Sequence, residues 1–272
     1  MTSAFHIPSA LSDAAALNDS DVQALERATV QAVSPQQLWE LPGWLVPVDS
    51  GTVGRARSAV PLQHSAPDLA QVPQVLSLYA AQRATPRWRL PDIPTFAALH
   101  TDLAARGFER TQPTLTQVAP VAHVMAATDA LAWPDGVEVT LAPQASAGWT
   151  AVFLGPDFDP VDGAHRAQAL ARAAGTCFVS ASVGGVVVAC GAVSLSHGWA
   201  GVHGMRTVAA WRGRGLAGAL LRRMAQQAQA VAVDRVFLQV DAGNTGAQSL
   251  YRRLGFVTAW PYAYWQPVAP QA

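Results

Sequence analysis

Residues 207–218 read Thr-Val-Ala-Ala-Trp-Arg-Gly-Arg-Gly-Leu-Ala-Gly and join a predicted strand, 199–208, to a predicted helix, 216–231. Gly213 and Gly215 allow a tight turn and let a bulky anion approach the main chain. The first N–H groups of the helix are unpaired and lie at the positive end of its dipole. A diphosphate fits such a loop, and Arg212 and Arg214 add positive charge at its rim.

A second motif begins about 30 residues further on, after a strand predicted over Arg235–Asp241. Residues 244–256 place Asn, Ala, Leu-Tyr and Leu-Gly-Phe at fixed spacing along a predicted helix, Thr245–Leu254, and at its end. The first loop is not a Walker loop, because GxxxxGK[ST] is missing. It is not a dinucleotide fingerprint either, which needs GxGxxG after a parallel strand.

Together the Arg-x-x-Gly-x-Ala pattern of Arg212–Ala217 and the motif of residues 244–256 resemble the two halves of the acyl-CoA site of the GNAT superfamily. Two motifs in the right order are far more specific than either alone. The resemblance covers about Trp149–Trp265. It implies a mixed α/β fold and an acetyl-CoA-dependent N-acetyltransferase.

The resemblance also implies the binding residues for acetyl-CoA, the co-substrate. The strand before the loop splays from its neighbour and pairs with the pantetheine arm, the loop binds the diphosphate, and Asn244 anchors the arm. The residues so assigned are Met205, Arg206, Thr207, Arg212, Gly213, Arg214, Gly215, Leu216, Ala217, Gly218 and Asn244.

Catalysis in this superfamily needs no protein nucleophile, because a primary amine attacks the thioester directly. The resemblance makes Tyr251 the general acid that donates a proton to the departing thiolate, and an ordinary tyrosine pKa near 10 keeps it protonated. The alternative is a tyrosine whose ring only fills the core.

The general base is less well defined by the sequence. Many superfamily members use a glutamate on the strand before the loop or on the next strand, but here the corresponding positions are Gly201 and Gln239. His203 is the remaining candidate, two residues before Met205 on the same predicted strand face. Serotonin N-acetyltransferase, another member, has a histidine at the equivalent position. His203 as a pocket wall, Asp241 as the base, and water remain alternatives.

The two halves of the chain resemble each other at an offset of about 148 residues. Arg106-Gly107-Phe108 then aligns with Leu254-Gly255-Phe256, and Trp88-Arg89-Leu90 aligns with Val236-Phe237-Leu238. The chemistry is absent from the first half, where His64, Pro67, Phe96 and Leu103 occupy the places of Arg212, Gly215, Asn244 and Tyr251. A proline has no N–H for a phosphate, and leucine carries no proton to donate.

We therefore predict a tandem GNAT-like acyl-CoA N-acyltransferase fold. Residues 1–135 form a degenerate N-terminal domain and residues 136–272 the catalytic domain. Bacterial tandem GNAT proteins are similar in carrying a Trp-containing strand and an Arg-x-x-Ser segment in the first half, here Trp44 and Arg55–Ser58. They commonly read Arg-Ala-Asn-Ser, so Arg57 is a departure.

Local patterns predict several further elements. The spacing of apolar residues predicts a helix over Asp21–Val33 with Ser20 as its N-cap, and a strand from Phe108 to about Val124. Gly184-Gly185 predicts a two-residue hairpin, since paired glycines accept positive φ.

Composition limits the range of partners. Arg plus Lys equals Asp plus Glu, and only 13% of residues are charged, which argues against nucleic acid and acidic membranes as partners. Cys177 and Cys190 are too isolated for a metal site, so we expect no metal. No apolar run approaches about 20 residues and the N-terminus lacks a leader pattern, so we expect a cytosolic monomer or homodimer.

Three functions remain open at this point: the enzyme, a non-catalytic acyl-CoA sensor or scaffold, and ribosomal or tRNA modification. Tyr251 favours the enzyme, with a small-molecule or peptide amine as acceptor. The segments 156–166 and 260–265, which the resemblance assigns to acceptor binding, contain Asp157, Asp159 and Asp162 and the aromatic residues Trp260, Tyr262, Tyr264 and Trp265. Acids beside aromatics favour a cationic amine; loop acids and core aromatics are the alternative.

Overall fold

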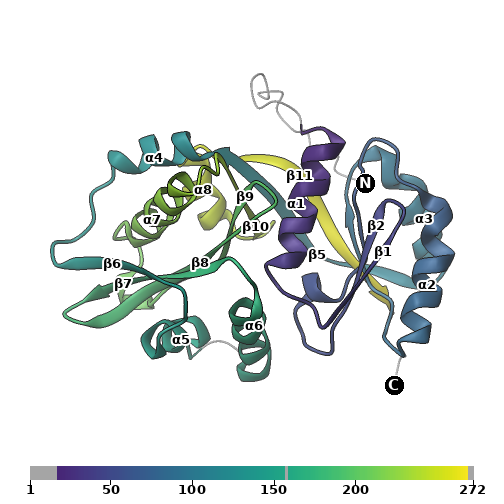
Figure 1. Ribbon diagram of the computed structural model, residues 1–272, viewed down its shortest axis with the longest axis horizontal. Coiled ribbons are helices and arrows are strands. Elements are labelled where there is room, and N and C mark those ends of the chain that lie inside the picture. Colours follow the sequence, from purple (N-terminus) through teal and green to yellow (C-terminus); the bar gives the residue numbers. More distant parts are fainter. Residues whose placement is uncertain (1–16, 157–158, 269–272) are drawn as a thin grey trace, which may run out of the picture.

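The computed structural model describes residues 17–156 and 159–268 (Figure 1). Asp157, one of the predicted acceptor-binding acids, lies outside this range. The elements of the first half are α1 (Asp19–Gln31), β1 (Gln37–Leu41), β2 (Trp44–Val48), β3 (Val60–Pro61), α2 (Val72–Ala81), β4 (Trp88–Pro91), α3 (Ala97–Ala105), β5 (Phe108–Pro120) and α4 (Val121–Asp129), with short 3-10 helices at Gly54–Ala56, Leu69–Gln71 and Pro94–Phe96.

The second half follows the predicted order closely. Its elements are β6 (Val137–Ala142), α5 (Ala147–Leu154), α6 (Pro160–Arg172), β7 (Thr176–Val183), β8 (Val186–Ser196), β9 (Trp199–Thr207), a 3-10 turn (Ala209–Trp211), α7 (Leu216–Ala230), β10 (Arg235–Asp241), α8 (Thr245–Arg253) and β11 (Val257–Pro267). The hairpin between β7 and β8 is confirmed, with φ of +55° and +79° at Gly184 and Gly185.

Eight strands form one mixed sheet in the order β4-β11-β5-β10-β9-β8-β7-β6. All neighbours are antiparallel except β9 and β10, which are parallel. A separate three-stranded sheet, β1-β2-β3, belongs to the first half. The predicted mixed α/β class is confirmed.

Helices cover both faces of the large sheet (Figure 1). Side chains alternate along a strand, so Val236 and Leu238 of β10 pack in the cluster that contains α7, and Phe237 between them packs against Leu25 and Ala28 of α1. Trp149 and Phe153 of α5 pack on β7 and β8 from the same side as α1. We call these the α7 face and the α1 face of the sheet.

β5 and β11 run side by side across the middle of the molecule (Figure 1). β5, from the first half, lies between β10 and β11 of the second half, and β11 lies between β4 and β5 of the first. Each half thus contributes a strand to the other. Gln117 of β5 pairs with Thr258 of β11. The residue equivalent to Gln117 in the second half is Trp265, and the residue equivalent to Thr258 in the first half is Arg110. These two also pair, so the register has the two-fold symmetry of the repeat.

Helices α3 and α8 are also related by the offset of 148 residues. A shift of 148 residues places α3 on α8 at both ends, and Gly107 on Gly255, both with positive φ just after the helix. The repeat seen in the sequence therefore corresponds to equivalent elements. The predicted boundary at 135/136 lies in the link between α4 and β6, but the sheet is continuous across it, so the boundary between independent folding units stays a prediction.

Two local predictions were wrong, and one strand was not predicted. α1 is capped by Asn18 rather than Ser20. The Asn18 side chain accepts a hydrogen bond from the Asp21 N–H, and the Asp21 side chain accepts one from the Asn18 N–H, which together form a capping box. The strand from Phe108 ends at Pro120 and not near Val124, since the apolar run 121–125 is the packing face of α4. β1 was missed because its side chains are largely exposed and give no alternation.

The described helices include none that is both long enough and apolar enough to span a membrane.

Candidate active site

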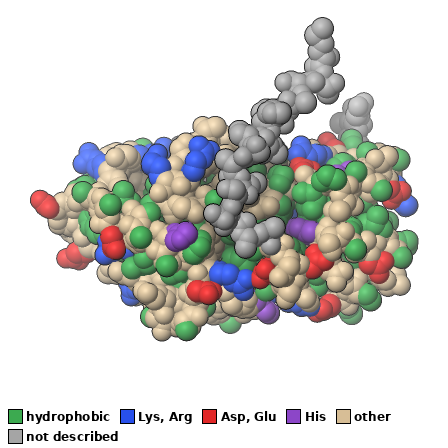
Figure 2. Space-filling model, turned by 90° about the horizontal axis from the view of Figure 1, so that it is seen from above, with side chains coloured by type: hydrophobic (Ala, Val, Ile, Leu, Met, Phe, Trp, Pro, Cys, Tyr) green, Lys and Arg blue, Asp and Glu red, His purple; other side chains and the backbone are tan. Residues whose placement is uncertain are grey.

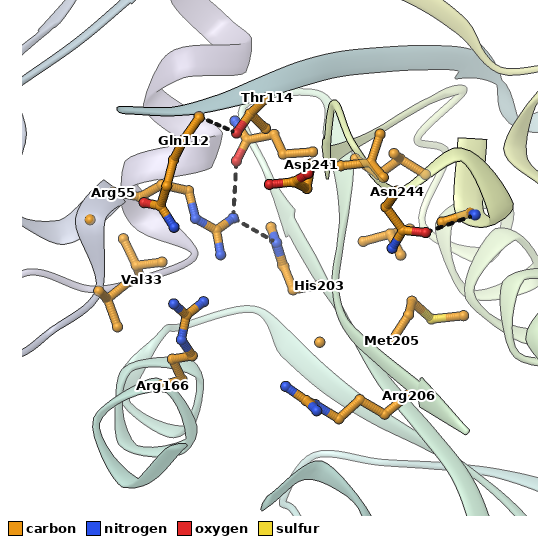
Figure 3. Close-up of a pocket in the computed structure, with 18 of the residues that line it drawn as sticks. Val33, Arg55, Gln112, Thr114, Arg166, His203, Met205, Arg206, Asp241 and Asn244 are labelled. Atoms are coloured by element: carbon orange, nitrogen blue, oxygen red, sulfur yellow. Dashed lines mark hydrogen bonds between the residues drawn. The ribbon is translucent and has the colours of Figure 1, made fainter. Parts of the chain in front are cut away.

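The parallel strands β9 and β10 separate at their carboxyl ends. They pair at Ala200–Val236, Gly201–Phe237 and Val202–Leu238 and no further, while Gln239–Asp241 of β10 continue to pair with β5. The edge of β9 that faces β10 is therefore open from residue 203 onward, as the resemblance implies. A cavity of about 840 Å³ lies at this splay and is lined by both halves of the chain (Figure 3).

A bulge in β9 shapes this edge. Ala192 of β8 pairs with His203 and Cys190 pairs with Arg206, so that Gly204 and Met205 lie opposite Gly191 alone. Gly204 has φ of +62°, and a Cβ there would lie 2.8 Å from the Phe153 ring. The residue must therefore be glycine for both conformation and space.

The bulge also corrects one prediction. His203 and Met205 were expected on the same strand face, but the extra residue reverses the alternation. Met205 packs in the cluster of the α7 face beside Met224, whereas His203 lies on the α1 face near Phe237. Both still line the cavity, with Arg206 and Thr207.

The loop of residues 212–218 has the predicted form. Gly213 and Gly215 have φ of +75° and +80°, and α7 begins directly after Gly215. Across the described chain, no backbone hydrogen bond is donated by the N–H groups of residues 213–218. The first turn of α7 therefore presents several unpaired donors, the arrangement that binds a phosphate group.

Side chains complete the loop. Arg212 lines the cavity and donates from Nε to the Thr207 carbonyl over 3.1 Å, whereas Arg214 lies over the Trp211 ring, 4.8 Å from its centroid. Residues 213–218, which include Leu216 and Ala217, are not part of the cavity wall itself. Gly215 and Gly218 also have a packing role, since a Cβ on either would lie within 2.7 Å of the segment Leu131–Ala132.

Asn244 and Tyr251 of the second motif both line the cavity. The Asn244 Oδ1 accepts the Ala247 N–H over 3.1 Å and caps α8, which leaves its amide nitrogen directed to the cavity (Figure 3). Tyr251 is buried against Phe256, and burial raises its pKa. No group in the described residues hydrogen-bonds its hydroxyl.

His203 has partners on both ring nitrogens. Arg55 Nη1 lies 3.2 Å from Nδ1, and Ser194 Oγ lies 2.9 Å from Nε2. A guanidinium only donates, so Nδ1 must accept and Nε2–H must donate to Ser194. Burial lowers the pKa of His203 well below its ordinary value, and the charge of Arg55 lowers it further. This geometry describes a neutral histidine with its lone pair in use, and does not support the base role suggested from the sequence.

Residues 145–256, which contain the splay, the loop and Tyr251, match the model of the Acetyltransferase (GNAT) family. This part of the chain is a GNAT acetyltransferase domain. A comparison with curated proteins found no match.

Solved structures similar to the whole chain include other GNAT proteins. A GCN5-related N-acetyltransferase from Kribbella flavida shares 19% identity with a TM-score of 0.69, covering 92% of this chain and 96% of that one. A tandem GNAT protein from the clavulanic acid biosynthesis pathway shares 13% identity with a TM-score of 0.58, covering 94% and 98%. A putative GNAT acetyltransferase from Novosphingobium aromaticivorans shares 18% with a TM-score of 0.52, covering 90% and 99%. At these identities the likeness concerns the fold.

The cavity of the GNAT domain is predominantly positive, which was not predicted from the sequence. Its lining includes five arginines and one acid: Arg55, Arg87, Arg166, Arg206, Arg212 and Asp241. Arg55 and Arg87 come from the first half of the chain. The signal for Arg55 was present in the repeat, because the offset of 148 residues makes it the equivalent of His203, which it contacts.

The proposed acid and aromatic site for a cationic acceptor is not supported. Asp159 caps α6, and Asp162 forms an ion pair with Arg166. Trp260 and Trp265 are core residues, and of the four aromatics only Tyr262 and Tyr264 line the cavity. Asp159 and Asp162 are thus already bound by protein groups.

Proposed function

We propose that the protein is an acetyl-CoA-dependent N-acetyltransferase that transfers an acetyl group to a primary amine of a small molecule or peptide. The observation that carries the proposal is the arrangement of three features at one splay: the open edge of β9 and Tyr251 line the cavity, and the loop before α7 adjoins it through Arg212. Each matches one part of a long acyl-CoA molecule.

The residues present fit this co-substrate. The unpaired N–H groups of residues 213–218 and the guanidinium of Arg212 would bind its diphosphate. The edge of β9 that faces β10 is open beyond the last pair of the two strands, and the amides of a pantetheine arm would bind there at Met205–Thr207 in strand fashion. The Asn244 amide nitrogen lies on the same wall as a further donor.

Tyr251 is the proposed general acid. The acceptor nitrogen forms a bond to the thioester carbonyl carbon, the carbon–sulfur bond breaks, and the thiolate takes the Tyr251 proton. The raised pKa of Tyr251 keeps that proton on the hydroxyl at neutral pH. The acceptor's surplus proton passes to water or to Asp241, because His203 has no free lone pair.

The positive lining assists this reaction. Five guanidinium groups against one carboxylate favour the neutral form of an amine in the cavity over its ammonium form. Because only the neutral amine is a nucleophile, the lining reduces the need for a strong protein base.

Acetyl-CoA binding measured by calorimetry tests the proposal, with a pair of variants at Gly213. A Cβ at this position meets no atom within 4 Å, and its φ of +75° is one that Asn and Asp tolerate best among non-glycine residues. Gly213→Asp places a negative charge beside the phosphate site, while Gly213→Asn has the same shape without the charge.

We expect one site per wild-type chain, and an affinity at least tenfold lower for Gly213→Asp than for Gly213→Asn. Equal affinities for the two variants would show that the diphosphate binds elsewhere. No binding by the wild-type protein would refute the proposed function.

A further inference from the structure

Arg55 lies where β9 and β10 first separate. Its Nη1 is 3.2 Å from both His203 Nδ1 and Gln239 Oε1, which belong to the first residues of the two strands beyond their last shared pair. It therefore spans the base of the splay, the point nearest to where the two strands part. Figure 3 shows its guanidinium beside His203.

Both of these partners of Arg55 are neutral. Gln239 is an amide, and His203 is held uncharged by burial and by Arg55 itself. Among residues 17–156 and 159–268, no carboxylate lies within ion-pair distance of Arg55. A half-buried cation with only neutral partners lacks charge compensation, so the site is suited to a negative charge supplied from outside the chain.

The surroundings of Arg55 increase this requirement. Arg166 extends from α6 toward Arg55 across the cavity (Figure 3). The pKa of Arg55 is lowered mainly by loss of solvent, and the charges of Arg166 and Arg89 lower it further. The chain as a whole has 18 basic and 18 acidic residues, yet the cavity has five of the former and one of the latter. The imbalance therefore belongs to this cavity and not to the composition.

The phosphates of acetyl-CoA do not account for Arg55. Their proposed site is the start of α7, which covers the α7 face of the sheet, and Arg212 lies there. His203 belongs to the opposite, α1 face, where α1 and α5 pack, and Arg55 approaches it from the first half of the chain. Arg55 thus lies on the side of the splay away from the loop, with Tyr262 and Tyr264 on the same cavity wall.

We propose that the acceptor amine carries an anionic group, a carboxylate or a phosphonate-like group, and that Arg55 binds this group with Arg166 facing it. Arg55 is then a specificity-determining residue supplied by the half of the chain that has no acyl-CoA loop of its own. The inference rests on the proposed function and names its substrate class. Charge-assisted bonds from guanidinium to carboxylate are among the strongest available for such selection.

Matched acceptors test the proposal. Wild-type protein is assayed with amino acids and with their amides, which retain the amine and lose the charge, and with aminoalkyl phosphonates as a second anionic class. We expect kcat/KM to be at least tenfold higher for the anionic forms. In parallel, calorimetry compares binding of N-acetylated amino acids, the expected products, with that of their amides. The ratio of carboxylate to phosphonate activity identifies the source of the anion.

Three variants locate the effect. Arg55→Gln is expected to raise KM for the anionic acceptor at least tenfold and to remove the preference over the amide, while the Kd for acetyl-CoA changes less than twofold. Arg55→Lys is expected to keep part of the preference. Arg253→Gln, the same substitution on an exposed arginine of α8 outside the cavity, serves as the matched control and should change neither value.

The outcomes separate the two proposals. Protein that binds acetyl-CoA but acetylates amides as well as acids, or no anionic acceptor at all, would overturn this inference and leave the proposed function standing. The inference would also be overturned if Arg55→Gln kept the full preference for the anionic acceptor over its amide. Failure of the wild-type chain to bind acetyl-CoA would refute the function itself, and this inference with it.

Discussion

In Tyr251 the ring and the hydroxyl have separate surroundings. Its ring is buried, but in the described structure its hydroxyl has no hydrogen-bond partner and faces the cavity. Removal of the hydroxyl therefore breaks no hydrogen bond in the described structure, which makes Tyr251→Phe a direct test of the proposed proton transfer. Tyr79, in the first half, is the opposite case, since its hydroxyl donates to the Pro47 carbonyl over 3.2 Å in the core.

We predict that Tyr251→Phe lowers kcat by about 100-fold, the usual lower contribution of a general acid, while the Kd for acetyl-CoA stays within about twofold. Steady-state kinetics and calorimetry measure the two values. The control, Tyr79→Phe, should lower the free energy of unfolding by about 1 kcal/mol through the lost hydrogen bond and leave kcat unchanged. A kcat for Tyr251→Phe near that of wild type would assign the proton to water.

His203 shows how a residue can be placed by the sequence and yet assigned a different role by its neighbours. Arg55 and Ser194 occupy both of its ring nitrogens, and its pKa is lowered by burial and by the charge of Arg55. In this setting the Nδ1 lone pair accepts from Arg55 and is not free to take a proton from an acceptor.

At the scale of an element, the bulge of β9 determines which side chains enter the cavity. Gly204 adds one residue against Gly191, which sends His203 to one face of the sheet and Met205 to the other. The bulge lies just beyond the last pair of β9 with β10, where the other edge of β9 is open. The shape of the site therefore depends on one residue that must have positive φ and no side chain.

We predict that Gly204→Ala lowers the free energy of unfolding by about 1–3 kcal/mol more than Gly185→Ala, because overpacking against Phe153 adds to the cost of positive φ. Gly185 is the matched control, as its φ of +79° is also positive but a Cβ there meets no atom within 4 Å. Chemical denaturation measures both values. Equal losses would mean that Phe153 moves aside without cost.

At the scale of the whole molecule, the exchange of β5 and β11 joins the two halves into one sheet. Ala119 of β5 and Val124 of α4 are buried in the same cluster as α7 and β10. A fragment without them would expose this cluster and the edges of β10 and β11. Acidic and basic side chains are intermixed on the face shown in Figure 2, so the cavity differs from the surface in its single sign of charge.

We predict that the full chain unfolds in one cooperative transition, and that residues 136–272 expressed alone fail to fold and fail to bind acetyl-CoA. Calorimetry and circular dichroism measure the two outcomes. Co-expression of residues 1–135 should restore binding, because it returns β4 and β5 to the sheet. A fragment of residues 136–272 that folds and binds acetyl-CoA by itself would contradict this prediction and make the second half an independent domain.

The sequence by itself determined the features that depend on neighbouring residues. The glycine loop, the motif of residues 244–256, the hairpin at Gly184-Gly185 and most elements follow from local conformational preference and periodicity. The repeat was also visible, because equivalent elements keep a fixed offset. Local signals failed where a strand such as β1 has exposed side chains, or where an apolar run fits a helix as well as a strand, as after Pro120.

Only the tertiary structure decided the features that depend on contacts between distant residues. The bulge at Gly204 is set by the pairing of β8 with β9, the exchange of β5 and β11 by pairing between the halves, and the position of Arg55 by a contact across 148 residues. The sign of charge in the cavity follows from the same long-range packing. The bulge, the strand exchange and the charge of the cavity leave no periodic trace in the chain. The offset of 148 residues makes Arg55 equivalent to His203 but does not show that the two side chains touch, because such contacts depend on how distant segments pack.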